Sequence, residues 1–133
     1  MGVEFEASKP MDWFRHDSDA ASDIKCRKLV RRCGMAGYGR WWRICELLAG
    51  STGHAVSVRT EEEAEMLADD LALDSTAELV DFLECLCEIG LLSGMGDGEF
   101  TSARMSESAL AVGKKRAAGK SGGRPRKRAP ETA

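Results

Sequence analysis

The chain has 133 residues, of which 43% are hydrophobic, and carries a formal net charge of −3. This size and composition predict one domain with tails, built on a hydrophobic core that needs no disulfide or metal staple. No apolar stretch approaches the roughly 18 residues of a transmembrane helix, so we expect no membrane association. The charge is uneven, because residues 1–112 hold 11 Lys and Arg against 21 Asp and Glu, whereas residues 113–133 hold 8 against 1.

The N-terminal residues 1–11 are expected to be flexible. The run at 11–14 is a short strand or docked segment, which we expect to bury Trp13 and Phe14. His16 and Asp17 then stand side by side before the first helix. A His–Asp pair can do acid–base work, but no nucleophile or metal partner lies nearby in sequence, so a structural role is favoured.

Residues 16–48 contain two helical patterns, from 23 to 33 and from about 38 to 48. In each, apolar residues recur at i, i+3, i+4 and i+7, which is one stripe of a helix. The stripes are Cys26, Leu29, Val30 and Cys33, and then Trp41, Ile44, Cys45 and Leu48. Gly34 is suited to end the first helix, and Ser18 or Ser22 to cap its start.

The next segment predicts a strand, two helices and a hairpin. A short strand at 54–59 precedes Thr60 and Glu63, the spacing of a capping box that opens a helix. Ser75 and Glu78 repeat this spacing for a second helix, which ends at Gly90. This helix is expected to bury Leu79, Phe82, Leu83 and Leu86. Asp97-Gly98 is a hairpin turn signal between two short strands. The fold class expected is mainly α with minor β: a winged helix-turn-helix over residues 12–112, with an extra N-terminal helix and a β-hairpin wing.

After residue 105 a helix can continue to about 118. Beyond the domain, residues 113–133 are rich in Gly, Pro and positive charge, so we expect a disordered basic tail.

The five cysteines do not have the spacing of a zinc site. The only close pair, Cys85 and Cys87, stands at i and i+2, and these positions point to different sides of a helix. The N-terminus is acidic and lacks the apolar run of a secretory signal. We therefore expect free, mostly buried thiols in a reducing, cytoplasmic setting, with no metal and no cofactor.

The sequence also resembles the N-terminal domain of phage replisome-organiser and primosomal DnaD-like replication proteins, over roughly residues 12–112. The residues that carry the resemblance are Phe14, His16, Asp17, Ala20, Asp23, Lys25, Leu29, Gly34, Gly37, Tyr38, Gly39, Trp42, Glu46 and Leu48. The resemblance implies a winged helix and helicase-loading or origin-remodelling partners. Longer members carry a second helical domain, which is not seen after residue 112, so an accessory or truncated member is expected.

Charge argues against the usual mode of DNA reading. The second helix of a helix-turn-helix normally enters the major groove, but here that helix carries only acids, which phosphates repel. These acids are instead candidates for binding a basic partner: Glu78, Asp81, Glu84 and Glu88. The candidate DNA-binding residues are cations elsewhere: Lys25, Arg27, Lys28, Arg31, Arg32, Arg40, Arg43, Lys114, Lys115, Arg116, Lys120, Arg124, Arg126, Lys127 and Arg128.

Two plainer interpretations of the cations stay open. Those of the first helix can form a solvated face or pair with the acids of residues 61–84, and the tail can be a solubilising end. With no catalytic constellation visible, we expect a non-enzymatic DNA-binding or assembly module of phage or mobile-element replication. It would bind DNA weakly and assemble with itself or with replication proteins. The alternatives are a protein-interaction module that uses the acidic helix, or a small transcriptional regulator.

Overall fold

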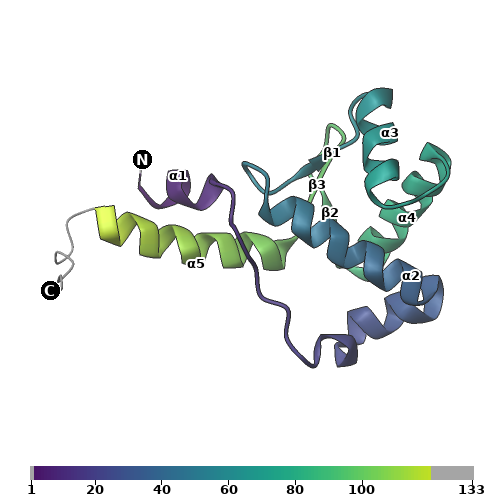
Figure 1. The fold of residues 1–133 in the computed structure, drawn as a ribbon, viewed down its shortest axis with the longest axis horizontal. Helices are drawn as coiled ribbons and strands as arrows, with labels where there is room; N and C mark the ends of the chain where they lie inside the picture. Colours follow the sequence, from purple (N-terminus) through teal and green to yellow (C-terminus); the bar gives the residue numbers. More distant parts are fainter. Residues whose placement is uncertain (1, 121–133) are drawn as a thin grey trace, which may run out of the picture.

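The computed structural model describes residues 2–120 (Figure 1). It is mainly helical with a small sheet, in agreement with the expected class. In chain order the elements are α1 (Val3–Ser8), the 3₁₀ turn η1 (Ala20–Ser22), α2 (Ile24–Ala49), β1 (Val56–Ser57), α3 (Glu61–Asp70), α4 (Thr76–Ile89), β2 (Ser93–Gly94), β3 (Glu99–Thr101) and α5 (Ala103–Lys120). Within this part of the chain, no helix is both long and apolar enough to cross a membrane.

The helix α2 is bent at Gly34, whose φ of 72° and ψ of −176° are not helical. Glycine accepts a positive φ without a Cβ penalty, so the predicted break is confirmed. The second half starts directly after the bend and not at Tyr38 as expected. The predicted cap was wrong, because the side chain of Asp23, and not Ser18 or Ser22, accepts hydrogen bonds from the N–H groups of residues 25 and 26.

The predicted apolar stripes build the core. Leu29, Ile44 and Leu48 are fully buried on α2, and Trp41 is 4% exposed. They pack with the buried faces of α3 and α4, where the predicted Leu83 is 2% exposed. Burying a side chain of this size contributes about 1.5–3 kcal/mol, so these stripes fix how the three helices assemble.

The caps of α3 and α4 differ in one bond. Thr60 and Glu63 form the full reciprocal capping box, as predicted. Ser75 accepts from the N–H of Glu78 at 3.1 Å, but the carboxylate of Glu78 accepts from the N–H of Asp74 instead of that of Ser75. The second predicted box is therefore half formed: one of its two hydrogen bonds is present, and the other goes to the residue before the cap.

The three strands form an antiparallel sheet in the order β1-β3-β2. β2 and β3 make the predicted hairpin, with Ser93 opposite Thr101. β1 joins the other edge of β3, with Val56 opposite Phe100. Arg59, just after β1, holds the hairpin turn through ion pairs with Asp97 at 3.2 Å and Glu99 at 3.1 Å.

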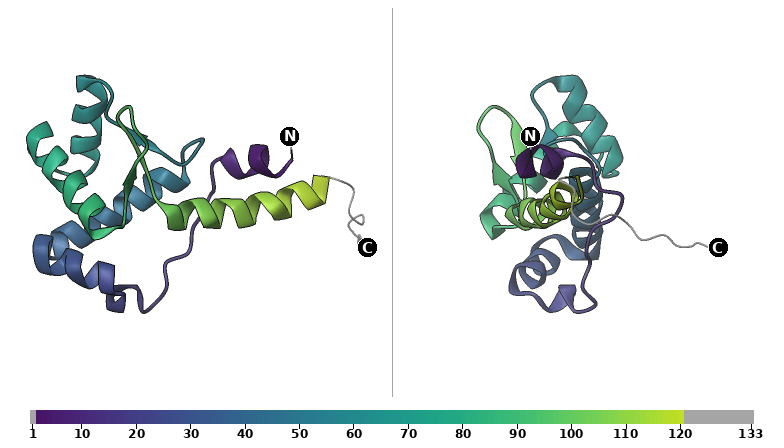
Figure 2. Two further views of the ribbon diagram at one scale, coloured as in Figure 1. Left: turned by 180° about the vertical axis from the view of Figure 1, so that it is seen from behind. Right: turned by 90° about the vertical axis from the view of Figure 1, so that its left-hand side faces the viewer.

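α1 and α5 run side by side and form an arm that projects from the body of the molecule (Figure 2). A Cβ at Gly113 would lie 2.7 Å from the Cα of Ala7, so glycine is what allows the helices to approach so closely. Arg116 adds hydrogen bonds to the carbonyls of Glu6 and Pro10.

The arm corrects two expectations. Residues 3–8 were expected to be flexible but form a helix that packs on α5. The expected boundary at residue 112 lies inside α5, which continues to Lys120. The remaining part of the predicted tail, residues 121–133, lies outside the described residues.

The segment between α1 and η1 crosses the body without regular structure and corrects the prediction for Trp13. That side chain is 76% exposed, whereas Met11 is buried and its N–H donates to the carbonyl of Ala49 at 2.8 Å. Phe14 is half-buried and stacks against Trp42, with ring centroids 6.0 Å apart. The segment is thus anchored by Met11 and Phe14, and Trp13 between them faces solvent.

Candidate nucleic-acid interface

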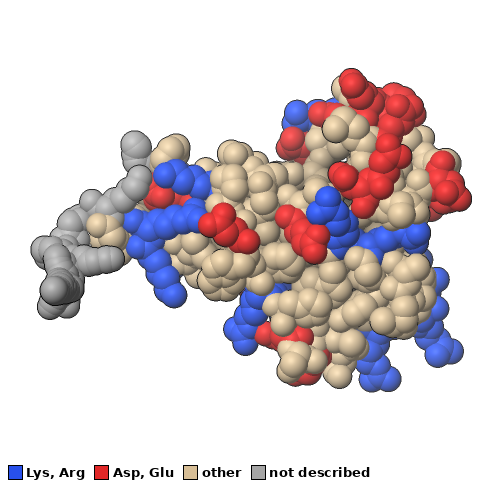
Figure 3. Space-filling view, viewed as in Figure 1, with Lys and Arg blue, Asp and Glu red and all other residues tan. Residues whose placement is uncertain are grey.

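Charge is separated on the surface of the protein (Figure 3). Asp and Glu gather over α3 and α4, whereas Lys and Arg lie over the first part of α2 and over the far end of α5. We call residues 24–33 of α2, before the bend, the basic half-helix. Because phosphate is repelled by the first region and attracted by the second, the basic half-helix is the first place to look for a nucleic-acid interface.

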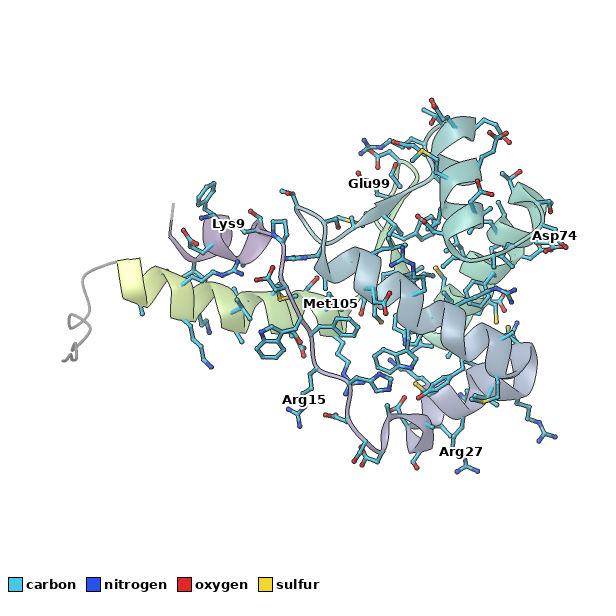
Figure 4. The ribbon with its side chains drawn as sticks, viewed as in Figure 1. Lys9, Arg15, Arg27, Asp74, Glu99 and Met105 are labelled. Atoms are coloured by element: carbon cyan, nitrogen blue, oxygen red, sulfur yellow. The ribbon has the colours of Figure 1, made fainter. Side chains whose placement is uncertain are left out.

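Three predicted cations of the basic half-helix are fully available. Arg27, Lys28 and Arg31 are exposed, and none of them makes an ion pair with any residue in the described range 2–120. In Figure 4 Arg27 points away from the body at the lower edge, while Asp74 lies on the acidic side. Arg27 is therefore directed away from the acids of α3 and α4, whereas Lys28 and Arg31 lie nearer to Glu88 at the end of α4.

Beside these cations lies a shallow hollow of about 230 Å³, lined by Lys28, Arg31, Arg32, Glu88 and Ile89. Arg32 and Glu88 are joined across it by an ion pair with an Nη2–Oε1 distance of 2.8 Å. This hydrogen bond raises the pKa of Arg32 further, so its charge is permanent. Three cations face one carboxylate here, which leaves the hollow positive and chemically suited to a phosphate group.

Four of the predicted DNA-binding cations of α2 instead bind other residues of this chain. Arg40 donates to the carbonyls of Leu71 and Ala72 at 2.6 and 3.1 Å, where α3 ends. The other three make these contacts: Lys25 with the carbonyl of Gly90, Arg32 with Glu88, and Arg43 with Glu46 and Asp70. Arg32 of the first helix thus pairs with an acid just outside the expected range 61–84, and Arg43 of the second pairs with Asp70 inside it. Arg40 acts as a brace between α2 and α3.

The arm carries a second group of predicted cations. Lys114 and Lys115 are exposed on α5, whereas Arg116 is engaged with the carbonyls beside α1. Lys120 is the last residue of α5. The remaining predicted residues, Arg124, Arg126, Lys127 and Arg128, lie outside the described part of the chain.

The predicted acidic partner site is also divided. Asp81 and Glu84 are exposed on α4. Glu78 accepts from the N–H of Asp74 at 3.2 Å, and Glu88 is paired with Arg32. Of these four residues, Asp81 and Glu84 in the middle of α4 are therefore the carboxylates with no partner among the described residues.

The structure separates His16 from Asp17. The His16 ring stacks on Trp42 with centroids 3.5 Å apart, while Asp17 pairs with Arg15 and with Arg104. The two side chains thus fasten the N-terminal segment to α2 and α5, which supports the structural role. Among residues 2–120, no group of three or more His, Cys, Asp or Glu is placed to hold a metal ion.

A cavity of about 340 Å³ lies between this segment, α2 and the start of α5. Trp41, Trp42 and Met105 are among its apolar walls, and Arg15 and Arg104 are among its charged ones. Among the described residues, the indole Nε1 of Trp42 is the one buried side-chain nitrogen or oxygen that lacks a hydrogen-bond partner. Cations and carboxylates both line the cavity, so its charge does not favour one class of ligand.

Sequence reasoning missed one contact between chemically reactive groups. The thiols of Cys33 and Cys85 lie 3.4 Å apart, although 52 positions separate them in the chain. Their spacing carried no signal, because only the packing of α2 on α4 brings them together. The one available hint was that Cys33 belongs to the apolar stripe of its predicted helix and that Cys85 lies next to the apolar residues of its own.

Comparison with known proteins identifies the family but adds no named relative. Residues 13–105, well over half of the chain, match the family model described as Lin1244/Lin1753-like, N-terminal. No curated protein and no solved structure matches the chain. The matched range runs from the exposed Trp13 to the first turn of α5, so it contains the basic half-helix, the helix pair and the hairpin. The chain belongs to the Lin1244/Lin1753-like N-terminal family.

Proposed function

We propose that this protein is a non-catalytic, winged helix-turn-helix module of phage or mobile-element DNA replication that binds DNA weakly through its basic half-helix. One observation carries the proposal: Arg27, Lys28 and Arg31 are exposed, and none of them makes an ion pair with another of the described residues. Lys and Arg that neutralise phosphates release counterions, which yields binding without sequence preference.

The arrangement of elements supports the winged-helix part of the proposal. α3 and α4 are consecutive helices joined by a short turn, and β2 and β3 form a hairpin directly after them. The resemblance of residues 12–112 to phage replisome-organiser proteins supports the replication setting. α4 stands where a recognition helix would stand, but its exposed charges are acidic, so the basic half-helix takes over the contact with phosphate.

The test is a fluorescence anisotropy titration of random-sequence duplex and single-stranded DNA with the full chain at several salt concentrations. A variant with Arg27→Gln, Lys28→Gln and Arg31→Gln keeps helix propensity high and removes three charges. Each lost phosphate contact lowers the log–log salt slope by about 0.9, so the slope should flatten by about 2–3 and affinity should fall on every sequence.

The matched control changes Asp81→Asn and Glu84→Gln, which are equally exposed but on the acidic side. This variant should bind DNA equally well or slightly more tightly, because repulsion is removed. An unchanged salt slope in the triple variant, or loss of binding in the control, would contradict the proposal.

A second function is favoured by exposed apolar side chains on the acidic side. Met66 on α3 is 62% exposed and Val80 on α4 is 46% exposed, with Asp81 and Glu84 nearby in sequence. Apolar side chains ringed by carboxylates suit a basic, partly apolar protein partner such as a replication protein. The Asp81→Asn, Glu84→Gln variant tests this too, since a partner of that kind should dissociate faster from it.

A further inference from the structure

A pair of thiols lies at the bend of α2. Cys33 is the last residue before Gly34, and its Sγ is 3.4 Å from the Sγ of Cys85 in α4. Cys33 is half-buried and Cys85 is 7% exposed. A disulfide has an S–S length of about 2.05 Å, so the sulfurs need to approach by little more than 1 Å to bond.

The surrounding contacts hold both thiols in place. Lys25 donates to the carbonyl of Gly90, and Arg32 pairs with Glu88, so three successive contacts join the basic half-helix to α4 in antiparallel order. Gly37 leaves room for the side chain of Cys33, because a Cβ at position 37 would lie 2.3 Å from the Cys33 Cβ. The pair is therefore part of a built interface between two helices.

The other cysteines are less suited to reaction. Cys26 and Cys45 are 2% and 4% exposed, and burial raises the pKa of Cys45 to about 12. Cys87 is half-buried on α4, and its sulfur makes no contact with another sulfur among the described residues. Only Cys33 combines partial exposure with a second thiol at contact distance, which makes it the site of first attack.

We propose that Cys33 and Cys85 are a redox modification site, at which a low-molecular-weight disulfide converts the two thiols into one intramolecular disulfide that locks the basic half-helix to α4. The inference is independent of the proposed DNA binding, since it concerns the thiols and the bend alone.

The reaction proceeds by two thiol–disulfide exchanges. The Cys33 thiolate attacks one sulfur of the reagent, displacing a thiolate that takes up a proton and leaving a mixed disulfide on Cys33. The Cys85 thiolate then attacks the Cys33 sulfur and displaces the second half of the reagent as a thiol. The protein loses two hydrogens and two electrons, and the reagent is reduced to two thiols.

The electrostatics around Cys85 favour the second step. In the reduced protein burial is the largest cause that raises the pKa of Cys85 to about 11, followed by its hydrogen bond with Cys33, while Arg32 lowers it. Once Cys33 carries a mixed disulfide, its thiol no longer contributes to that increase, whereas Arg32 still acts. The second thiolate thus forms more readily when it is needed.

The experiment incubates the full chain with a series of ratios of glutathione to glutathione disulfide, followed by intact-mass analysis and peptide mapping under non-reducing conditions. The expected product has lost two hydrogens and contains a Cys33–Cys85 cross-linked peptide. Its melting temperature should exceed that of the reduced protein by about 5–15 °C, because the bridge closes a long loop. Amide hydrogen exchange at residues 24–33 should slow on oxidation, because the bend is fixed.

The variants separate this pair from other thiol chemistry. Cys33→Ser should give no intramolecular bridge, and Cys85→Ser should stop at a stable mixed disulfide with one glutathione. The control Cys87→Ser, which removes a thiol two positions from Cys85, should oxidise like the original chain. The proposal is overturned if the original chain forms no bridge, if the mapped bridge joins Cys26 to Cys45, or if hydrogen exchange at residues 24–33 is unchanged by oxidation.

Discussion

The guanidinium of Arg40 on α2 donates a 2.6 Å hydrogen bond to the carbonyl of Leu71, the residue directly after α3. A second bond reaches the carbonyl of Ala72, which has a φ of 57°. The last carbonyls of a helix have no partner inside that helix, and a cation placed there also suits the helix dipole. Arg40 therefore joins α2 to α3, although its charge alone made it a candidate for binding DNA.

The first prediction separates these two roles of Arg40. Arg40→Gln should lower the free energy of unfolding by about 1–3 kcal/mol, because charge-assisted hydrogen bonds to helix-end carbonyls are lost. The salt slope of DNA binding should stay unchanged. Urea unfolding and DNA titration check this, with Arg27→Gln as the matched control that keeps stability and loses slope. A stable Arg40→Gln protein with a flatter slope would show that Arg40 meets phosphate.

The second prediction concerns His54, which connects α1 to the end of α2. Its Nδ1 lies 2.8 Å from the carbonyl of Leu48 and its Nε2 lies 2.7 Å from the carbonyl of Ala7. His54 is 4% exposed and has a φ of 55°, a conformation that Asn also tolerates. His54→Asn should keep the backbone but lose the bond to Ala7.

The expected effect is a cost of about 1–3 kcal/mol, together with earlier proteolytic cleavage between α1 and η1. Limited proteolysis followed by mass analysis detects the cleavage, and Thr52, which is exposed in the same loop, gives the control Thr52→Asn. Equal cleavage rates in all three proteins would mean that α1 is held by α5 alone.

The third prediction compares two C-terminal truncations. Removing residues 113–133 also removes Gly113 and Arg116, which pack against and bond to the α1 segment. The melting temperature should then fall by several degrees. Removing residues 121–133 keeps all of α5, so the melting temperature should change little while DNA binding weakens, because four cations are lost. Calorimetry of both truncated chains decides whether the arm or the tail is structural.

The fourth prediction is a pH dependence caused by Cys45. Burial raises its pKa from 9.0 to about 12, so the folded protein keeps a neutral thiol where the unfolded chain has a thiolate. The resulting stability is complete below pH 9 and is lost as the pH rises from 9 towards 12. In this range the free energy of unfolding should fall by about 1 kcal/mol per pH unit through this group.

Cys45→Ala should lose part of this alkaline slope, though it costs some stability at pH 7 because a buried atom is removed. Urea unfolding in a reducing buffer from pH 7 to 10.5 measures both slopes. Identical slopes would mean that the thiol of Cys45 titrates normally in the folded protein.

The sequence by itself determined the local structure of this protein. The stripes through Leu29, Ile44 and Leu83, the capping box at Thr60 and the bend at Gly34 were all predicted, because each depends on residues within one or two helical turns. Helix stripes and caps are short-range physical chemistry, so a single sequence is enough to find them. The separation of acidic and basic charge was also visible, since it needs only the order of the residues.

The tertiary structure decided which of these groups meet. Trp13 is exposed while Met11 is buried, because a backbone hydrogen bond to Ala49 sets the path of the segment. The N-terminal residues, which were expected to be flexible, form α1 because they pack on α5, where Gly113 allows the two helices to approach closely. The tertiary structure also decides which cations are paired and which are free, since the packing of α2 against α4 brings Arg32 to Glu88. Such contacts join residues that lie dozens of positions apart, and no local pattern records them.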